Sequence, residues 1–484
     1  MGLALTLVAA LIMAVMALVR PRIAVFTLMA LFIFFKELGV GFASSSGSFV
    51  FNQYFVNFLN FKFIEFVIPA TWLALVLRGG ASRPPYLLFE RRLMILLLLW
   101  VVVLIFVEHF LHGYINVGYF RLLLSGFMLL HCFSMIIKTE EELNAFIKVF
   151  LVMIAAAALI GLIKYVLGYG VLGLRGTVPF YFDSKQINAF AFGAVLMLAY
   201  VVNYPDLSPG GRILPKVLAY IMFAILAVTV ILCFRRTLWV IMIFSSLAVL
   251  LMSRRVKVPQ FVAIMFSLLI MVIALLAAPQ MADTRSRLAT YVGSMNLFDA
   301  GVVESQENKV HLENVQQYTL MIRENPGIML FGVFGYPGED YLRLATVYSG
   351  ENQARLGTPH NAILKSIVTF GLPGLLIYMA MFVALFYKSR AVGRLPVNKL
   401  SRLTAQTSLI FLFFQFSSSL FFVPPFYTHA KGLMYTFLMV LFVRASLGLG
   451  SDSVRRGRAD AGGHPGQRLP KSIIGIDKQA GLKL

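Results

Sequence analysis

The chain has 484 residues, of which 59% are hydrophobic and only 13% are charged, and its mean hydropathy is +0.83. Soluble domains carry about 25% charged residues, so this composition excludes a water-soluble protein. The formal net charge of +21 would suggest nucleic-acid binding in another context. Here the basic residues gather in alternate short loops, as the positive-inside rule expects, and nucleic-acid binding is only a remote alternative.

Long apolar runs recur along the whole chain, and a transmembrane helix needs about 20 mostly apolar residues. The runs are continuous rather than alternating, which favours helices over a closed barrel. The sequence therefore predicts an all-α polytopic membrane protein with about 12–14 transmembrane helices. The candidate spans are 2–19, 23–35, 61–77, 93–107, 118–137, 145–166, 187–203, 216–234, 237–252, 259–278, 361–387, 403–422 and 429–447.

The distribution of charge predicts the topology. Residues 279–359 hold nine acidic and six basic side chains, so we expect this loop to face outward. An odd number of spans then places the N-terminus outside and the tail inside. The first apolar run lacks a basic segment before it and is followed at once by another, so we read it as a span and not as a cleaved signal peptide.

Four regions follow from this topology. Residues 1–278 form the first ten spans, 279–360 an outward-facing loop domain that contains helices, and 361–447 the last three spans. The remaining residues, 448–484, are rich in Gly, Arg and Asp, which is typical of a disordered tail, and we expect this tail to be cytoplasmic and basic.

The stretch 216–252 is too long for one span, because a helix rises by only about 1.5 Å per residue. It predicts a tight helical hairpin with Arg235 and Arg236 at its outer turn. Two arginines at that depth are costly unless an anionic group meets them, so we favour a functional role for this pair.

A third candidate cation, Arg175, lies in the outer loop after the sixth span. Guanidinium groups bind phosphate through forked hydrogen bonds. Snorkelling to lipid headgroups is an equally good interpretation of Arg175.

Within the outward loop, residues 305–324 have the pattern of an amphipathic helix. The segment Glu324-Asn325-Pro326-Gly327 should end it, and a glycine-spaced stretch that includes Tyr336 follows. His311 lies on the expected helix, where exposure to solvent is the simplest interpretation.

The end of the loop, Gly357-Thr358-Pro359-His360-Asn361, predicts a helix start. Thr358 is a good N-cap and Pro359 a favoured first residue, which puts His360 in the first turn at the outer membrane surface. The helix dipole there disfavours the imidazolium form, and a neutral imidazole can act as a general base. The alternative is a capping or interfacial histidine.

Other kinds of site find little support in the sequence. No cluster of acidic and histidine residues has metal-ligand spacing, and no glycine-rich nucleotide loop is present. Cys132 and Cys233 fall within apolar runs and suggest neither a disulfide nor zinc. We expect no metal and no cofactor.

His360-Asn361, nine further residues and then Gly371-Leu372-Pro373-Gly374 resemble the signature of the O-antigen ligase and polymerase superfamily. In that superfamily a His followed by Asn, Ser or Gln precedes nine residues and a Gly-x-x-Gly or similar pattern, at the end of a large periplasmic loop. The arginine-bearing turn, the Arg175 segment and the Asn325-Pro326 segment resemble further elements of that superfamily.

The resemblance implies a GT-C-like, metal-independent glycosyltransferase of the bacterial inner membrane. It implies an undecaprenyl-diphosphate-linked glycan as donor and a sugar hydroxyl as acceptor, on the lipid A-core or on another lipid-linked glycan. His360 would then deprotonate the acceptor, while Arg235, Arg236 and Arg175 would hold the diphosphate. Asn361, His311 and Tyr336 would contact the acceptor or sugar, and membrane lipid and polysaccharide-export proteins would be the remaining partners.

Some positions depart from the superfamily pattern. Lys309, His311 and Val315 stand near the start of the loop helix, where an Arg and a Trp are usual, and the turn reads Phe-Arg-Arg rather than Ser-Arg-Gly. These departures favour a polymerase slightly, whereas the His-Asn pair favours a ligase, so both stay open. The alternatives are a flippase-like transporter of lipid-linked oligosaccharide and a scaffold for an envelope complex.

Overall fold

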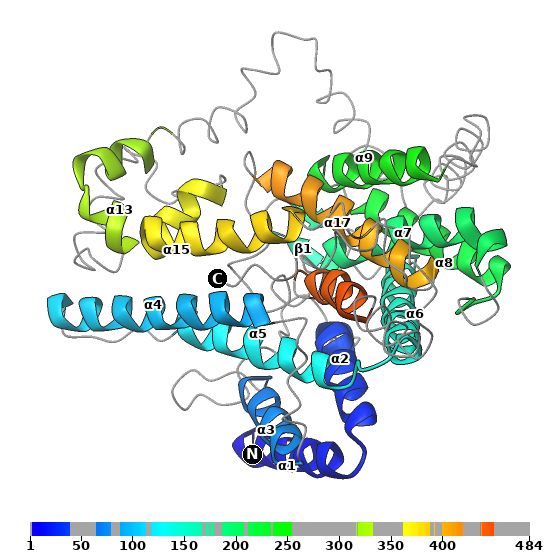
Figure 1. Cartoon of the computed structure of the whole chain (residues 1–484), viewed down its shortest axis with the longest axis horizontal. Helices are drawn as coiled ribbons and strands as arrows, with labels where there is room; N and C mark the ends of the chain where they lie inside the picture. The colour runs from blue at the N-terminus through cyan, green and yellow to red at the C-terminus, as the bar shows by residue number, and fades with distance from the viewer. Residues whose placement is uncertain are drawn as a thin grey trace, which may run out of the picture.

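The structure is a computed structural model, and it describes residues 2–38, 64–78, 88–112, 118–166, 171–173, 176–178, 186–207, 212–233, 236–253, 316, 318–332, 362–387, 392, 399–419, 436 and 438–449. These residues are nearly all helical, and several of the helices lie alongside one another (Figure 1). The predicted all-α membrane fold is therefore confirmed. One antiparallel pair of short strands, β1 (Val171–Gly173) and β2 (Gly176–Val178), was not predicted.

The helices follow the apolar runs of the sequence. In chain order they are α1 (Gly2–Val19), α2 (Pro21–Leu38), α3 (Ile64–Leu77), α4 (Leu88–His112), α5 (Gly118–Met135), α6 (Glu140–Val166), α7 (Gln186–Asn203), α8 (Lys216–Leu232), α9 (Arg236–Met252), α13 (Gly327–Phe331), α15 (Ala362–Tyr387) and α17 (Lys399–Ser419). A short 3₁₀ turn, Tyr204–Asp206, extends α7, and residues 438–449 form a C-terminal helical segment. The predicted span 259–278 lies outside the described residues.

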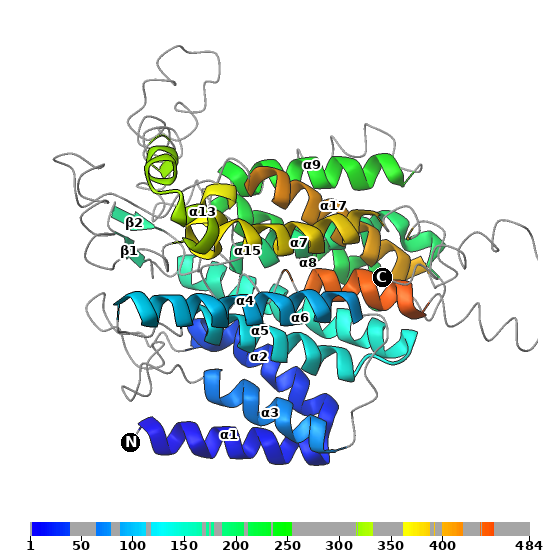
Figure 2. The same cartoon turned by 60° about the vertical axis from the view of Figure 1, so that its left-hand side comes forward.

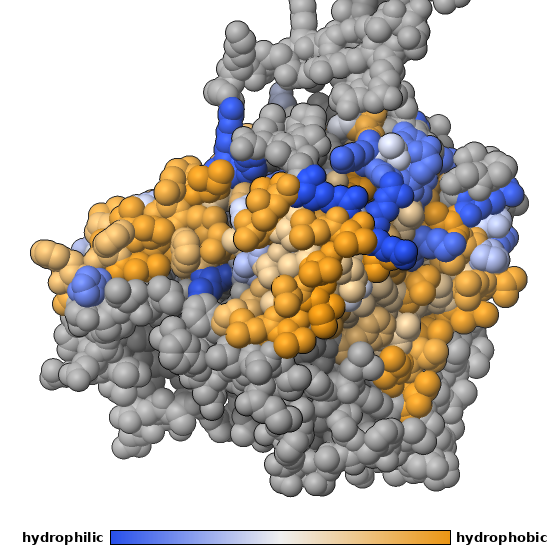
Figure 3. All heavy atoms as spheres, turned by 90° about the horizontal axis from the view of Figure 1, so that it is seen from below, coloured by the Kyte–Doolittle hydropathy of each residue, from blue (hydrophilic) through white to orange (hydrophobic). Residues whose placement is uncertain are grey.

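Four of these helices are long and apolar enough to cross a membrane, judged by length and composition within the described part of the chain. They are Phe89–Leu111, Glu140–Ile163, Ile187–Asp206 and Ser366–Tyr387, and seven shorter apolar helices accompany them. Large apolar side chains also cover much of the surface, such as Phe110 at 90% exposure and Leu11 at 64%. Figure 3 shows such apolar areas on one face of the molecule. Exposed apolar surface of this extent suits lipid rather than water.

Several helices are longer than the apolar runs that predicted them. The expected span 93–107 is part of α4, which begins at Leu88 and continues to His112, and the expected short span 23–35 is part of α2. In α4 the extra residues at both ends include charged side chains, Glu90 and Glu108 among them. A hydropathy pattern stops at the first charge, whereas a helix continues through the polar headgroup region.

The core is centred on α7, which packs against α6, α8, α9 and α17. Its residues from Ile187 to Val201 are buried throughout. Aromatic rings fill the space around it: Phe192 lies edge-on to Phe411 with ring centroids 5.5 Å apart, and Phe150 meets Phe442 at 5.9 Å. A helix buried on all sides reads as uniformly apolar, which is why its sequence shows no polar face.

Two further groups of helices flank this core. α1, α2 and α3 form one edge of the bundle, and α4 lies beside α15 and α5 (Figure 2). The start of α1, the β1–β2 hairpin and α13 all lie at the same end of the bundle (Figure 2).

Ion pairs join the helices at positions that the topology prediction places on the inner side. Glu90 of α4 pairs with Arg444 of the C-terminal helical segment, and both side chains are almost fully buried. Lys399 Nζ lies 2.5 Å from Asp206 Oδ2, at the junction of α17 with the end of α7. A buried pair must be matched closely, since either charge alone would be costly in this interior.

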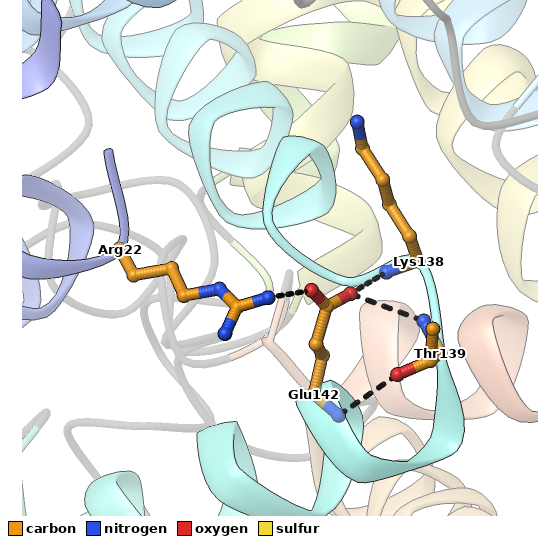
Figure 4. Close-up of polar contacts among 4 residues, drawn as sticks. All are labelled: Arg22, Lys138, Thr139 and Glu142. Atoms are coloured by element: carbon orange, nitrogen blue, oxygen red, sulfur yellow. Dashed lines mark hydrogen bonds and ion pairs between the residues drawn. The ribbon is translucent and has the colours of Figure 1, made fainter. Parts of the chain in front are cut away.

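The start of α6 is fixed by a capping box (Figure 4). The Glu142 amide donates to Thr139 Oγ1 at 3.3 Å, and the Thr139 amide donates back to Glu142 Oε2 at 3.1 Å. The Lys138 amide donates to the same carboxylate oxygen at 2.7 Å, and the Arg22 guanidinium pairs with the other oxygen. One glutamate thus satisfies free amides at the helix start and ties α6 to the start of α2.

Candidate functional site

Most of the predicted site residues lie outside the described part of the chain. This holds for His360, Asn361, Arg235, Arg175, His311 and Tyr336, whereas Arg236 is placed as the first residue of α9. The assignments of these side chains therefore stay predictions. The structure does describe the elements that lead directly to them, namely α15, α13, the pair α8–α9 and the β1–β2 hairpin.

α15 begins two residues after His360 and is kinked at Gly371. The backbone there has φ 68° and ψ 179°, which is not helical, and Pro373 follows within the same helix. Proline lacks an amide to donate and clashes with the preceding turn, so it reinforces the break. The nine residues between Asn361 and Gly371 therefore form a separate helical segment, 362–370, which leads directly from the candidate base.

The outward loop contributes a second helix that the sequence analysis missed. The helical segment 318–324 ends at Glu324, as predicted, and the Asn325 amide donates to the Met321 carbonyl at 3.0 Å. Pro326 then precedes α13, which runs over Gly327–Phe331 and ends at Gly332 with φ 62°. Proline at a helix start was a readable signal for this second helix.

α13 and the first segment of α15 touch through their main chains. A Cβ atom on Gly371 would overlap the Leu330 carbonyl oxygen and lie 2.5 Å from its carbon, and one on Gly332 would lie 2.7 Å from the Val368 oxygen. Both glycines have a positive φ in a region that is essentially restricted to glycine. We call this contact the glycine joint.

A small apolar cluster surrounds the glycine joint. Ile328 of α13 is fully buried, and it packs with Tyr318, Met321 and Val368, which are also buried. Ile322 and Leu364 lie against these residues and are partly buried. The cluster holds residues 318–332 of the loop against the segment of α15 that leads from His360.

Trp100 of α4 contacts both sides of the glycine joint. Its Nε1–H donates to the Phe370 carbonyl at 2.7 Å, directly before the kink. Its ring lies nearly parallel to that of Phe331, with centroids 6.3 Å apart and an interplanar angle of 15°. One side chain therefore connects α4 with α15 and with α13, a connection that has no signature in the sequence.

The predicted division of the stretch 216–252 into two helices is confirmed, because α8 ends at Leu232 and α9 begins at Arg236. Both helices pack mainly on α7 rather than on each other. Trp239 Nε1 donates to the Val230 carbonyl at 3.1 Å and so closes the turn. Arg236 therefore stands at a helix N-terminus, where the backbone amides add to the attraction for an anion.

Arg175 lies in the sequence between the two strands β1 and β2. In the antiparallel register Gly173 pairs with Gly176. Residues 174 and 175 between them lie outside the described part of the chain. The β1–β2 pair lies at the same end of the bundle as α13 (Figure 2).

Other ligating residues do not gather in the described part of the chain. Among those residues, no group of three or more His, Cys, Asp or Glu side chains is placed to hold a metal ion. Cys132 and Cys233 are both buried thiols.

Residues 221–379 match the family model described as O-antigen ligase. The resemblance to the O-antigen ligase and polymerase superfamily is thereby confirmed. The match covers about a third of the chain. It includes most of α8, all of α9 and α13, and the kinked part of α15. His360, Asn361, Arg235 and Arg236 also fall within it. A search of the curated proteins finds no match to this chain.

Proposed function

We propose that this protein is a glycosyltransferase of the bacterial inner membrane that works at the periplasmic face. It moves a glycan from undecaprenyl diphosphate to an acceptor sugar hydroxyl. The observation that carries this proposal is the O-antigen ligase match over residues 221–379, the range that holds His360 and the Arg235–Arg236 turn. The loop domain over 279–360 and the first turn of α15 form the acceptor side.

His360 acts as the general base in this proposal. It takes the proton of the acceptor hydroxyl while the hydroxyl oxygen attacks the anomeric carbon of the donor sugar. The bond from that carbon to the diphosphate oxygen breaks, and undecaprenyl diphosphate leaves with the bonding electrons. Asn361, His311 and Tyr336 contact the acceptor or the donor sugar, and no metal or cofactor takes part.

The arginines stabilise the charge on the leaving group. Arg235 and Arg236 hold the diphosphate at the start of α9, and Arg175 approaches it from the β1–β2 hairpin. Fixed cations outside bulk water stabilise a developing charge without having to reorganise during the reaction. The enzyme thus contributes position and electrostatics, and the activated donor contributes the driving force.

The acceptor decides between the two activities within the superfamily. A ligase transfers the glycan to the lipid A-core, whereas a polymerase transfers it to another lipid-linked glycan. The test is to incubate the purified protein with an undecaprenyl-diphosphate-linked glycan and each acceptor in turn. Ligated product, longer polymer or neither identifies the activity, and movement of the lipid-linked glycan across a vesicle membrane without transfer would instead support a transporter.

Two variants test the assigned residues. We expect His360→Ala to lower transfer to a small residual rate, while His109→Ala, which removes an exposed histidine near the C-terminal end of α4, leaves transfer unchanged. We expect Arg236→Ala to raise the KM for the donor, while Arg323→Ala, which removes an exposed arginine of the outward loop, does not. Full transfer by the His360 variant would refute the general-base role, and an unchanged donor KM would refute the diphosphate role.

A further inference from the structure

Trp100 connects α13 and α15, the two helices of the glycine joint, to α4. Its indole N–H reaches the Phe370 carbonyl of α15, and its ring lies on Phe331 of α13. Phe370 is fully buried and Trp100 is partly buried, so this hydrogen bond is partly shielded from solvent, which strengthens it. The contact lies at the kink, where the regular helical hydrogen bonds of α15 are interrupted.

α4 is a firm support for this contact. It is one of the four helices long enough to cross the membrane, and it packs along both α5 and α15. Its inner end is fastened to the C-terminal helical segment by the buried Glu90–Arg444 pair. Trp100 follows Glu90 by ten residues, or about 15 Å along the helix axis. The ion pair of Glu90 therefore also restrains the position of the indole along the bundle.

The position of the kink controls the far end of the segment 362–370. From Phe370 to Ala362 the segment rises by about 12 Å, so a tilt of about 5° at the kink moves its far end by about 1 Å. His360 follows that end by two residues. A misplacement of about 1 Å of a reacting group can cost about a hundredfold in rate.

We propose that Trp100 is a positioning residue for His360. Trp100 connects the kink of α15 and the adjacent α13 to α4, and it thereby sets the position of His360. This inference rests on the proposed function, because it requires His360 to be the base. Trp100 does not touch the substrate in this proposal. It acts only through the geometry of the helix that leads to His360.

The test is the variant Trp100→Phe, which keeps a ring to stack on Phe331 and removes only the indole donor. We expect kcat to fall about tenfold or more, while the KM for the lipid-linked donor changes by less than about twofold. The donor arginines belong to other elements, so a loss confined to kcat separates misplacement of the base from general damage. An unchanged kcat, or a loss that appears mainly in the donor KM, would overturn the inference.

Trp72→Phe is the matched control. It removes an equivalent indole donor, which reaches His131 Nδ1 at 2.9 Å, from a partly buried tryptophan between α3 and α5. We expect it to leave kcat unchanged. An equal loss of kcat in both variants would show that any buried indole donor is needed for folding and would overturn a specific role for Trp100.

A double variant separates this inference from the proposed function. If Trp100 acts through His360, Trp100→Phe should change the residual rate of His360→Ala by less than about twofold. Equal losses in both backgrounds would overturn the inference alone. Full activity of the single His360→Ala variant would overturn the base assignment, and this inference with it. If His360→Ala leaves no measurable rate, the inference is tested by whether Trp100→Phe alone lowers kcat or raises the donor KM.

A second variant covers the case in which Trp100→Phe does not fold. Phe331→Leu removes the stacked ring and leaves the indole hydrogen bond, and it should lower kcat in the same selective way. Melting in detergent and a single peak in size-exclusion chromatography establish that each variant is folded. A folded Phe331→Leu variant with full kcat would overturn the role of the stack.

Discussion

The glycine joint makes Gly371→Ala the sharpest perturbation that the structure offers. An alanine there meets two penalties at once, because its backbone must keep φ near 68° and its Cβ would overlap the Leu330 carbonyl. The backbone conformation alone costs about 1–3 kcal/mol for a residue other than glycine. Relief of the overlap requires α13 to withdraw by at least about half an ångström at the carbonyl carbon, more than a close-packed contact tolerates.

Withdrawal of α13 also exposes the buried side chain of Ile328. Ile328 is fully buried against α15, and burial of one such side chain is worth roughly 1.5–3 kcal/mol. Against these combined costs we expect residues 327–332 to detach while the membrane helices stay folded. Transfer should then fall at least tenfold, because the segment that leads from His360 loses the element packed against it.

Hydrogen exchange followed by mass spectrometry measures the detachment directly. The variant should lose protection over residues 318–332 and keep it over α7, whose residues from Ile187 to Val201 are buried. Gly327→Ala is the control, since it adds the same methyl group to α13, the helix that Gly371 contacts, at a position where nothing lies within 4 Å of it. Wild-type protection and full transfer in Gly371→Ala would refute the close backbone contact described here.

Three further outcomes test the supporting structure. Glu90→Ala should lower the stability by about 3–5 kcal/mol, because it leaves Arg444 buried without its carboxylate, and replacing both residues by Leu should recover most of the loss in a melting assay. Glu142→Ala should cost about 1 kcal/mol in the same assay, since the capping box at the start of α6 is lost. Trp239→Phe should raise the donor KM several-fold with kcat nearly unchanged, because it frees the turn before Arg236.

The fold class could be read from the sequence, because transmembrane helices are set by a property of each segment alone. Apolar length gave the positions of α5, α7, α8 and α9 to within a few residues. The ends of α4 were not predicted, since its charged residues continue the helix beyond the apolar run. The β1–β2 hairpin was not predicted either, because three-residue strands between glycines carry too short a pattern to detect.

The candidate site divides in the same way. The signature around His360 and the turn at Arg235–Arg236 could be found from residue types and spacing. The glycine joint could not be found in this way. Gly371 contacts the main chain of Leu330, and Gly332 contacts the main chain of Val368, far along the chain in each case. A pattern of side chains carries no information on such contacts. The role of Trp100 was even harder to predict, since its indole donates to the Phe370 carbonyl, which lies 270 positions further along the chain.

A joint made of main-chain atoms has a consequence for how the outward loop can change. Leu330 meets Gly371 through its carbonyl group, so this part of the contact places no demand on the type of side chain at position 330, which is in fact 54% exposed. The restricted positions are the two glycines, Phe331 with its stack on Trp100, and the buried cluster beneath them. The exposed positions of residues 318–332 are therefore free to vary, while the spacing between α13 and the segment 362–370 stays constant. Substitutions at these exposed positions would leave the contact between α13 and α15 in place.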